Sequence, residues 1–177
     1  NLLYIIAGVV VERVSGQTWT DFVTKRLLEP IGMTNSAANW HMLANKKNAI
    51  DPHVPIDGKL QVIDRYTNTI FDAAAGIYSN VDDVAKWLQF NLDKGKVNGK
   101  QIISEKQMKE MISPVTLQKV GTTPPYNSLF KAYGLGWQLQ DYNGKLEVSH
   151  TGGLEGIVTQ TIWYPQLNLG IVVLTNQ

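Results

Sequence analysis

The chain contains no cysteine among its 177 residues. This absence excludes disulfide bonds, a thiol nucleophile and any zinc or iron–sulfur site held by cysteine. It leaves the cellular compartment open, because proteins without cysteine occur on both sides of a membrane. Histidine is scarce as well, with three residues and neither an H-x-x-x-H nor an H-E-x-x-H spacing. The sequence therefore predicts no metal site and implies no cofactor, and we interpret His41 and His53 as solvated loop residues.

Strong net charge is also missing. Sixteen Lys and Arg oppose fifteen Asp and Glu, which gives a formal net charge of +1. A surface so balanced has no field strong enough to attract nucleic acid or an acidic membrane, so we expect neither as a partner. The sequence contains no G-x-S-x-G nucleophile elbow and no phosphate-binding loop, so the enzyme classes built on those motifs find no support.

Long hydrophobic runs are absent too. The apolar stretch over residues 2–11 is closed by Glu12 and Arg13 and is too short for a membrane span. It lacks the basic segment that precedes the core of a signal peptide. We interpret it as a buried helix that begins upstream of Asn1. Because an apolar strand pattern also ends two residues before the end of the chain, we expect an internal piece of a longer protein, truncated at both ends.

The first two-thirds of the chain carries helix signals. Thr18 is suited to cap a helix, Ser79–Asp82 resembles a capping box, and Ser104 with Gln107 forms another. Together with apolar spacing and Gly or Pro end signals, these predict helices over about residues 2–14, 19–29, 81–94 and 105–113. The polar, irregular stretch over 35–66 is typical of a long surface loop of the kind that lines a site.

After Pro114 the pattern changes to strands. Asn143-Gly144 is a strong hairpin signal, because a type I′ turn needs positive φ at both central residues. The predicted strands cover Tyr133–Leu139, a segment through Val148, Val158–Tyr164 and Leu169–Thr175. Helices followed by an antiparallel meander indicate the α+β class. We expect one domain over 1–177, with a helical part over about 1–113 and a sheet part over about 133–177.

The most informative motif is His150-Thr151-Gly152-Gly153. A His and a Thr leave a strand just before two glycines, and the small glycines let a substrate backbone lie close to the strand edge. By themselves the four residues favour the simpler interpretation, a glycine turn beside a capped histidine.

Further markers occur in a fixed order along nearly the whole chain. They are Ala7-Gly8 with Glu12 and Val14-Ser15-Gly16; Leu28-Glu29-Pro30-Ile31-Gly32-Met33; Ala75-Gly76-Ile77-Tyr78-Ser79 with Asp83 and Lys86-Trp87-Leu88; Tyr133-Gly134-Leu135-Gly136-Trp137; the His150 motif with Gly156; and Gly170 to Asn176. With them the sequence resembles the serine β-lactamase and penicillin-binding-protein superfamily, on its class C-like branch. That branch also contains D,D-peptidases, esterases and D-aminopeptidases.

The resemblance implies a partial β-lactamase/transpeptidase-like fold and an active site built from three motifs. S-x-x-K would lie upstream of this chain, Asn1 would be the last residue of Y-x-N, and His150-Thr151-Gly152 would be the third motif. The whole enzyme would use a Ser nucleophile activated by Lys and Tyr. This chain would supply His150, the Gly153 N–H as an oxyanion-hole donor, the Asn1 side-chain amide, and Thr151 with Gly152 as substrate-binding residues.

His150 stands where most β-lactamases of this family have Lys. Because His is often neutral at pH 7, a fixed attraction for an anionic substrate is weaker. This departure favours a peptidase, esterase or amidase acting on small molecules or peptidoglycan-like peptides over a true β-lactamase. By the same resemblance, the location would be periplasmic or extracellular. Because the chain lacks both the Ser and the Tyr, we expect it to be catalytically silent alone.

Ser128-Leu129-Phe130-Lys131 fits S-x-x-K but is a decoy. The motif works when one helical turn brings the Lys amine beside the Ser hydroxyl, and here Pro124-Pro125 precede it while a predicted strand follows. It also follows the position of Y-x-N, which is the wrong order.

Two other functions remain open at the level of the sequence. One is a non-catalytic relative that binds cell wall or a partner, which substitution of the upstream Ser would decide. The other is an unrelated α+β interaction domain, in which His150 and Gly153 would not line a cleft. We further expect an exposed sheet edge that invites self-association.

Overall fold

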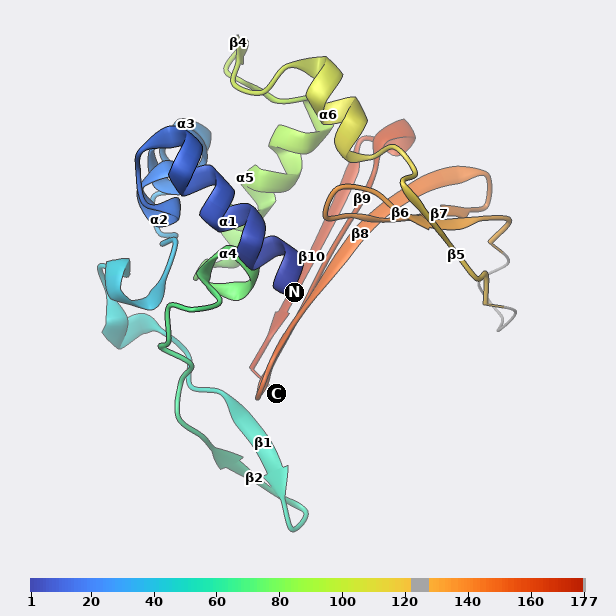
Figure 1. The fold of residues 1–177 in the computed structure, drawn as a ribbon. Coiled ribbons are helices and arrows are strands. Elements are labelled where there is room, and N and C mark those ends of the chain that lie inside the picture. The colour runs from blue at the N-terminus through green and yellow to red at the C-terminus, as the bar shows by residue number, and fades with distance from the viewer. Residues whose placement is uncertain (122–127, 177) are drawn as a thin grey trace. The chain divides into compact units, whose positions relative to one another are not determined.

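A computed structural model describes residues 1–121 and 128–176 (Figure 1). Its contacts divide the chain into two units, which are described separately. Unit 1 contains Asn1–Lys86, Gly152–Thr159 and Leu174–Gln177, and unit 2 contains Trp87–Thr151 and Gln160–Val173. The combination of helices with an antiparallel sheet confirms the α+β prediction. No helix among the described residues combines the length and the apolar character needed to cross a bilayer.

The helices largely follow the sequence signals. The helical segments are α1 Leu2–Ser15, α2 Trp19–Val23, η1 Thr24–Leu28, α3 Glu29–Ile31, η2 Trp40–Met42, η3 Lys46–Asn48, α4 Asp72–Ala75, α5 Val81–Leu92, α6 Glu105–Met111 and η4 Pro165–Leu167. Thr18 caps α2 by accepting the N–H of Asp21 at 3.1 Å, and Ser104 with Gln107 caps α6 as predicted. At α5 the side-chain cap is Asn80, which accepts the N–H of Asp83, and not Ser79.

Six strands form the main sheet in the order β10-β9-β8-β7-β6-β5 (Figure 1). Their bounds are β5 Thr116–Gln118, β6 Lys131–Tyr133, β7 Gln138–Tyr142, β8 Lys145–Leu154, β9 Ile157–Tyr164 and β10 Leu169–Thr175. Asn143 and Gly144 have φ of 49° and 72°, which confirms the type I′ turn between β7 and β8.

Three features of the strands differ from the sequence prediction. The stretch expected as one strand from Tyr133 to Leu139 is instead the end of β6, a turn and the start of β7, since Gly136 has φ of 84°. The sheet begins at β5, earlier than residue 133. Two hairpins also lie in the part expected to be helical: β1 His53–Ile56 with β2 Lys59–Val62, and β3 Lys96–Val97 with β4 Lys100–Gln101.

The hydrophobic core of unit 2 lies between the sheet and α5. Its buried members are Leu88, Ala132, Trp137, Leu139, Val148 and Trp163. Gly170 on β10 lies against Leu88, since a Cβ there would come within 3.1–3.2 Å of two Leu88 carbons. The Trp137 and Trp163 rings meet edge to face with centroids 6.0 Å apart. This packing fixes one face of β8 toward the core.

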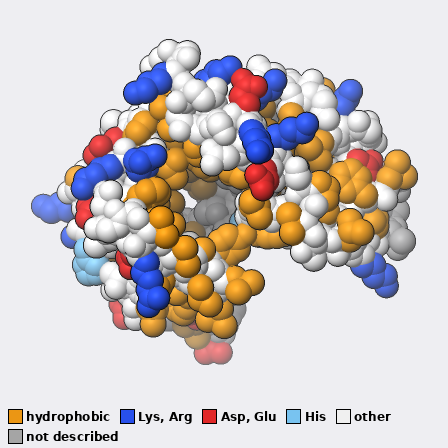
Figure 2. Space-filling model, turned by 45° about the horizontal axis from the view of Figure 1, so that its top comes forward, with side chains coloured by type: hydrophobic (Ala, Val, Ile, Leu, Met, Phe, Trp, Pro, Cys, Tyr) orange, Lys and Arg blue, Asp and Glu red, His pale blue; other side chains and the backbone are white. Residues whose placement is uncertain are grey.

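Unit 1 contains a buried carboxylate and an exposed apolar helix. Asp83 at the start of α5 is fully buried and accepts hydrogen bonds from the Asn35 N–H, the Ser36 hydroxyl and the Lys86 amine, each at 2.8 Å. In α1, by contrast, Gly8 is the buried residue while Leu2, Leu3 and Val14 are 74–83% exposed. The expectation of a buried first helix is therefore wrong for this chain. Figure 2 shows hydrophobic side chains spread among charged and polar ones at the surface.

Candidate functional site

The end of β8 extends beyond its pairing with β7. The two strands pair from Tyr142↔Lys145 to Gln138↔Ser149, whereas β8 continues to Leu154. A two-residue hairpin is closed by a hydrogen-bonded pair, and such pairs recur at every second residue of an antiparallel ladder. Lys145, Glu147 and Ser149 therefore direct their backbone N–H and C=O groups toward β7. By the same alternation the N–H groups of Thr151 and Gly153 point to that side, past the end of the β7 pairing.

The opposite side of this segment is occupied by β9. The Thr161 hydroxyl donates to the His150 carbonyl at 3.2 Å, which agrees with even-numbered residues of β8 directing their backbone toward β9. Thr151 and Gly153 thus carry the amide hydrogens that the β7–β8 ladder leaves unused among the described residues.

The two glycines of the motif have different surroundings. A Cβ at Gly152 would collide with Oγ1 of Thr159 on β9, so that position is closely packed. A Cβ at Gly153 would meet no heavy atom within 4 Å, and the residue is exposed. The first glycine therefore lets β8 and β9 approach, while the second leaves open space beside the strand.

His150 is exposed and held by one neighbour on the sheet. Its Nε2 lies 3.1 Å from the Tyr133 hydroxyl on β6, and the two rings stack edge to face with centroids 6.2 Å apart. Successive side chains of a strand alternate between its faces, so His150 shares the face of the buried Val148, and Thr151 lies on the other face. In the sequence, Tyr133 stands out only as part of the Tyr133-Gly134-Leu135-Gly136-Trp137 marker. The contact joins strands that are not adjacent in the chain, so no spacing signal could have found it.

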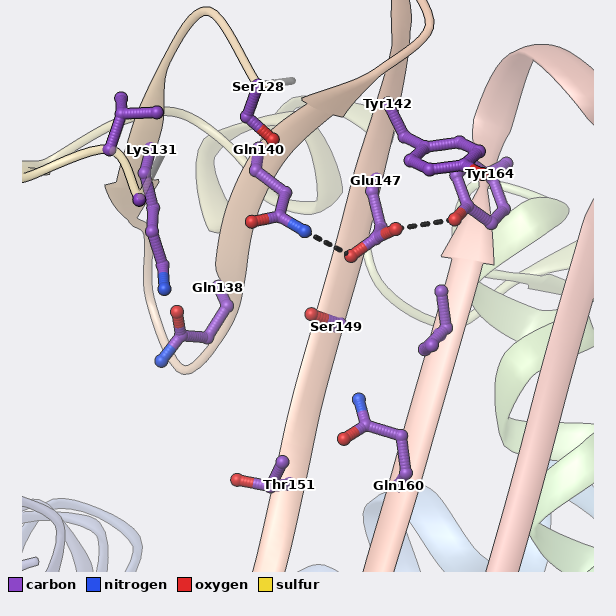
Figure 3. Close-up of a pocket in the computed structure, with 13 residues that line it drawn as sticks. Ser128, Lys131, Gln138, Gln140, Tyr142, Glu147, Ser149, Thr151, Gln160 and Tyr164 are labelled. Carbon is purple, nitrogen blue, oxygen red and sulfur yellow. Dashed lines mark hydrogen bonds between the residues drawn. The ribbon is translucent and has the colours of Figure 1, made fainter. Parts of the chain in front are cut away.

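Thr151 lines a cavity of about 740 Å³ with a mixed polar and apolar lining, on the other face of unit 2 (Figure 3). Glu147 also lines it; this residue is 7% exposed and accepts hydrogen bonds from the Gln140 amide at 2.7 Å and from the Tyr164 hydroxyl. Ser149, Gln160 and Lys131 border the same space. Each carboxylate oxygen accepts one hydrogen bond from the protein, and the cavity offers amide, hydroxyl and amine groups together with apolar surface.

Asn1 lies at the N-terminus of α1 in unit 1. Its carbonyl accepts the N–H groups of Tyr4 and Ile5 at 3.0 and 3.1 Å, while its side chain makes no capping hydrogen bond. The residue is exposed. Its side-chain amide makes no capping contact, and the donor role that the resemblance implies for it stays a prediction.

The S-x-x-K decoy is not helical. The Ser128 hydroxyl donates to the Asp141 carbonyl at 2.8 Å, and the Asp141 carboxylate accepts the N–H groups of Leu129 and Phe130. Lys131 then opens β6. The one-turn geometry that would bring a Lys amine to a Ser hydroxyl is thus absent from this segment, as predicted. The stretch at Pro124-Pro125 lies outside the described residues.

The two remaining histidines occupy defined positions in unit 1. His41 Nε2 lies 3.2 Å from the Thr67 carbonyl, and His53 Nδ1 lies 3.2 Å from the side-chain amide of Asn176. His53 is half-buried, so its interpretation as a solvated loop residue was wrong. The sequence did not predict the β1–β2 hairpin that contains His53, because the stretch over residues 35–66 is polar and irregular overall.

Comparison with known proteins gives a consistent result. A family model described as Beta-lactamase matches residues 1–177. Among curated proteins, the unguisins hydrolase ungD of Aspergillus violaceofuscus is 24% identical over 99% of this chain, and protein flp of Staphylococcus aureus is 27% identical over 99%. These matches cover 33% and 32% of the relatives, so the chain spans about a third of their length.

Solved structures share the fold. The octameric penicillin-binding protein homologue of Pyrococcus abyssi superimposes with a TM-score of 0.80 at 23% identity, over 98% of this chain and 37% of that one. A D-amino acid amidase from Ochrobactrum anthropi SV3, solved with D-phenylalanine, gives 0.73 at 19% identity, over 98% and 49%. At these identities the likeness concerns the fold alone.

Proposed function

Because this chain belongs to the beta-lactamase family, we propose that it is the part of a serine hydrolase that presents the end of β8 to an acyl group. The observation that carries the proposal is the continuation of β8 from His150 to Leu154 beyond the end of its pairing with β7. Strand alternation directs the Gly153 N–H to the side that β7 leaves open, and a Cβ at Gly153 would meet no heavy atom within 4 Å. A carbonyl carbon attacked by Ser develops negative charge on its oxygen, and a fixed backbone N–H stabilises that charge.

The mechanism divides between this chain and the rest of the protein. A Ser outside this chain attacks the acyl carbon, an acyl-Ser ester forms as the leaving group departs with a proton, and water or an amine then releases the acyl group. The Gly153 N–H is one oxyanion donor and the N–H of the Ser itself is the other; losing one such donor costs about 3–4 kcal/mol. Thr151 and Gly152 contact the substrate, and the Asn1 amide donates to a substrate carbonyl.

His150 bears on the choice of substrate. Its hydrogen bond with Tyr133 fixes the ring beside the open strand end. An imidazole is a weaker and pH-dependent attraction for an anion than a Lys amine. We therefore favour D-amino-acid peptides, amides or esters over β-lactams. In the full-length protein, the substitution His150→Lys should lower KM for anionic substrates several-fold and leave KM for neutral esters unchanged, with His41→Lys as the control.

The central test is acylation by a fluorophosphonate and by a fluorescent penicillin. The chain of 177 residues contains no Ser in a helical S-x-x-K, so we expect no covalent label on it. The full-length protein should be labelled by the fluorophosphonate at the upstream Ser. A covalent label on this chain alone would contradict the expectation that it is catalytically inactive. A full-length protein that is not labelled but still binds peptidoglycan fragments would favour a non-catalytic binding module.

Self-association is a separate proposal about the same molecule. Among the described residues, strand β10 lies at one edge of the six-stranded sheet. Three apolar side chains on it are 41–50% exposed: Leu169, Ile171 and Val173. Apolar edge strands pair readily with other chains. We expect sedimentation velocity to show concentration-dependent dimers of this chain; a monomer at every accessible concentration would contradict this.

A further inference from the structure

Three segments of unit 1 meet at the base of the β1–β2 hairpin. The His53 N–H donates to the carbonyl of Asn176 at 3.1 Å and is 3.3 Å from that of Gly156. A Cβ at Gly156 would lie 2.7 Å from the His53 nitrogen and 2.8 Å from Pro52 Cβ, so the turn between β8 and β9 packs directly on the hairpin. The base of the hairpin is thereby fastened both to the turn that follows Gly152-Gly153 and to the end of β10.

The side chain of Asn176 closes this junction. Its amide nitrogen lies 3.2 Å from the Asp51 carbonyl and 3.2 Å from Nδ1 of His53. A carbonyl oxygen only accepts, so the contact with Asp51 requires the nitrogen end of the amide at this place. The same nitrogen then presents its second N–H to His53. His53 must accept it through an unprotonated Nδ1, which places the ring proton on Nε2.

From this geometry we propose that His53 and Asn176 form a proton-sensitive latch on the β1–β2 hairpin. If Nδ1 of His53 were protonated, its N–H would face the side-chain N–H of Asn176. Neither group is an acceptor, so the hydrogen bond would be lost. Asn176 cannot turn its amide over to accept that proton without losing the bond to Asp51. The latch is therefore closed while Nδ1 of His53 is unprotonated and opens when Nδ1 binds a proton. This proposal is independent of the catalytic function proposed above.

Charged groups also occur on the elements around His53. The Asp51 carboxylate is engaged by Arg65 at 2.6 Å. Lys59 lies on β2, Asp64 follows that strand, and Glu155 is in the β8–β9 turn. An acidic group near His53 favours its charged form and a basic group opposes it. Within the described residues, the partner of His53 Nδ1 is the Asn176 amide.

The other two histidines provide internal controls. His41 donates to the Thr67 carbonyl, and a charged ring donates equally well. His150 contacts the Tyr133 hydroxyl, which can donate or accept, so this contact also survives protonation. Among the three histidines of the chain, His53 is thus the one whose hydrogen bond a proton abolishes.

Amide hydrogen exchange in the full-length protein tests the latch. The reporters are the N–H of His53 and that of Ile63, which donates to the Pro52 carbonyl at 3.0 Å. After correction for intrinsic rates, their protection should fall about five- to tenfold between pH 7.5 and 5.0, as expected for the loss of one hydrogen bond. In His53→Asn, whose side-chain oxygen lies at the same distance along the side chain as Nδ1 and accepts from Asn176 whatever the pH, protection should not change. The matched substitution His41→Asn should retain the wild-type pH response.

Two further measurements test the hydrogen bond between Asn176 and His53 directly. Asn176→Ala should show low protection at both pH values. Nitrogen NMR of the wild-type protein should find the Nε2–H tautomer of His53 at pH 7.5, which needs no variant to fold. An Nδ1–H tautomer, protection that does not change with pH in the wild type, or the same loss in His53→Asn would each overturn the latch. None of these outcomes depends on whether the protein hydrolyses a substrate.

Discussion

At the scale of single residues, Asp83 is a fully buried side chain of unit 1 that accepts three hydrogen bonds. Burial by itself would raise the pKa of its carboxyl, but hydrogen bonds from Lys86, Ser36 and the Asn35 N–H outweigh burial and hold the pKa below its usual range. Because the folded state binds this proton less tightly than the unfolded state, the carboxylate stabilises the fold above about pH 4. That contribution is lost as the pH falls through the lowered pKa of the folded state.

We predict that Asp83→Asn lowers the free energy of unfolding at pH 7 by about 2 kcal/mol, because an amide cannot accept all three donors. Urea unfolding should show a constant difference from wild type between pH 5 and 7 and a shrinking one below about pH 4. Asp82→Asn is the matched control, since that neighbour in the first turn of α5 is exposed. A difference that grows in acid would contradict the assigned direction of the pKa shift.

Gly152 and Gly153 allow a second comparison between neighbours. Gly152→Ala should destabilise the protein by about 1–3 kcal/mol, since its Cβ collides with Thr159 Oγ1. Gly153→Ala has space for its Cβ and should unfold at nearly the wild-type urea concentration. Adding Thr159→Ala to Gly152→Ala should restore part of the loss. Equal effects of the two alanine substitutions would show that crowding at β9 is not the reason for glycine at position 152.

At the scale of elements, the face of the sheet on α5 should dominate the stability of unit 2. Leu139 on β7 is fully buried in this core. Leu139→Ala should cost about 3 kcal/mol, because the removed carbons leave a cavity among well-packed neighbours. Leu117→Ala on β5, where the side chain is 81% exposed, should change the free energy of unfolding by less than about 0.5 kcal/mol. Thermal or urea denaturation of the two variants gives a direct ranking.

At the scale of the whole molecule, α1 is an apolar helix whose side chains are largely exposed to solvent. The helix is apolar on most faces, yet Leu3 is 79% exposed. The relatives are about three times as long as this chain, and we expect their additional part to cover such a helix. Leu3→Gln should therefore leave the stability of this chain nearly unchanged and reduce its binding of a hydrophobic dye. In the full-length protein the same substitution should cost about 1–3 kcal/mol.

Leu28→Gln serves as the control for that comparison, since Leu28 is 4% exposed in this chain. It should destabilise the short chain and the full-length protein alike. If Leu3→Gln proves equally mild in both, α1 is a surface helix in the whole protein and its apolar character has another cause.

The sequence by itself determined most of the elements and the family. Helix caps such as Thr18 and Ser104, the Asn143-Gly144 turn and the apolar runs of β9 and β10 are local signals, because each depends on residues within one turn or one strand. Motifs in a fixed order likewise identified the superfamily. Local signals also marked His150 to Gly153, but they assigned no partner to any of them.

Tertiary structure decided the rest, since it depends on contacts between residues far apart in the chain. The Tyr133 contact with His150, the direction of the Gly153 N–H, the Glu147 cavity and the junction of His53 with Asn176 all follow from strand register and chain crossing. The register of two paired strands depends on which faces of the strands can be buried together. No short stretch of the sequence contains that information. For the same reason the exposure of α1 escaped prediction: its apolar pattern is that of a buried helix, but among the described residues its neighbours cover only the side at Gly8.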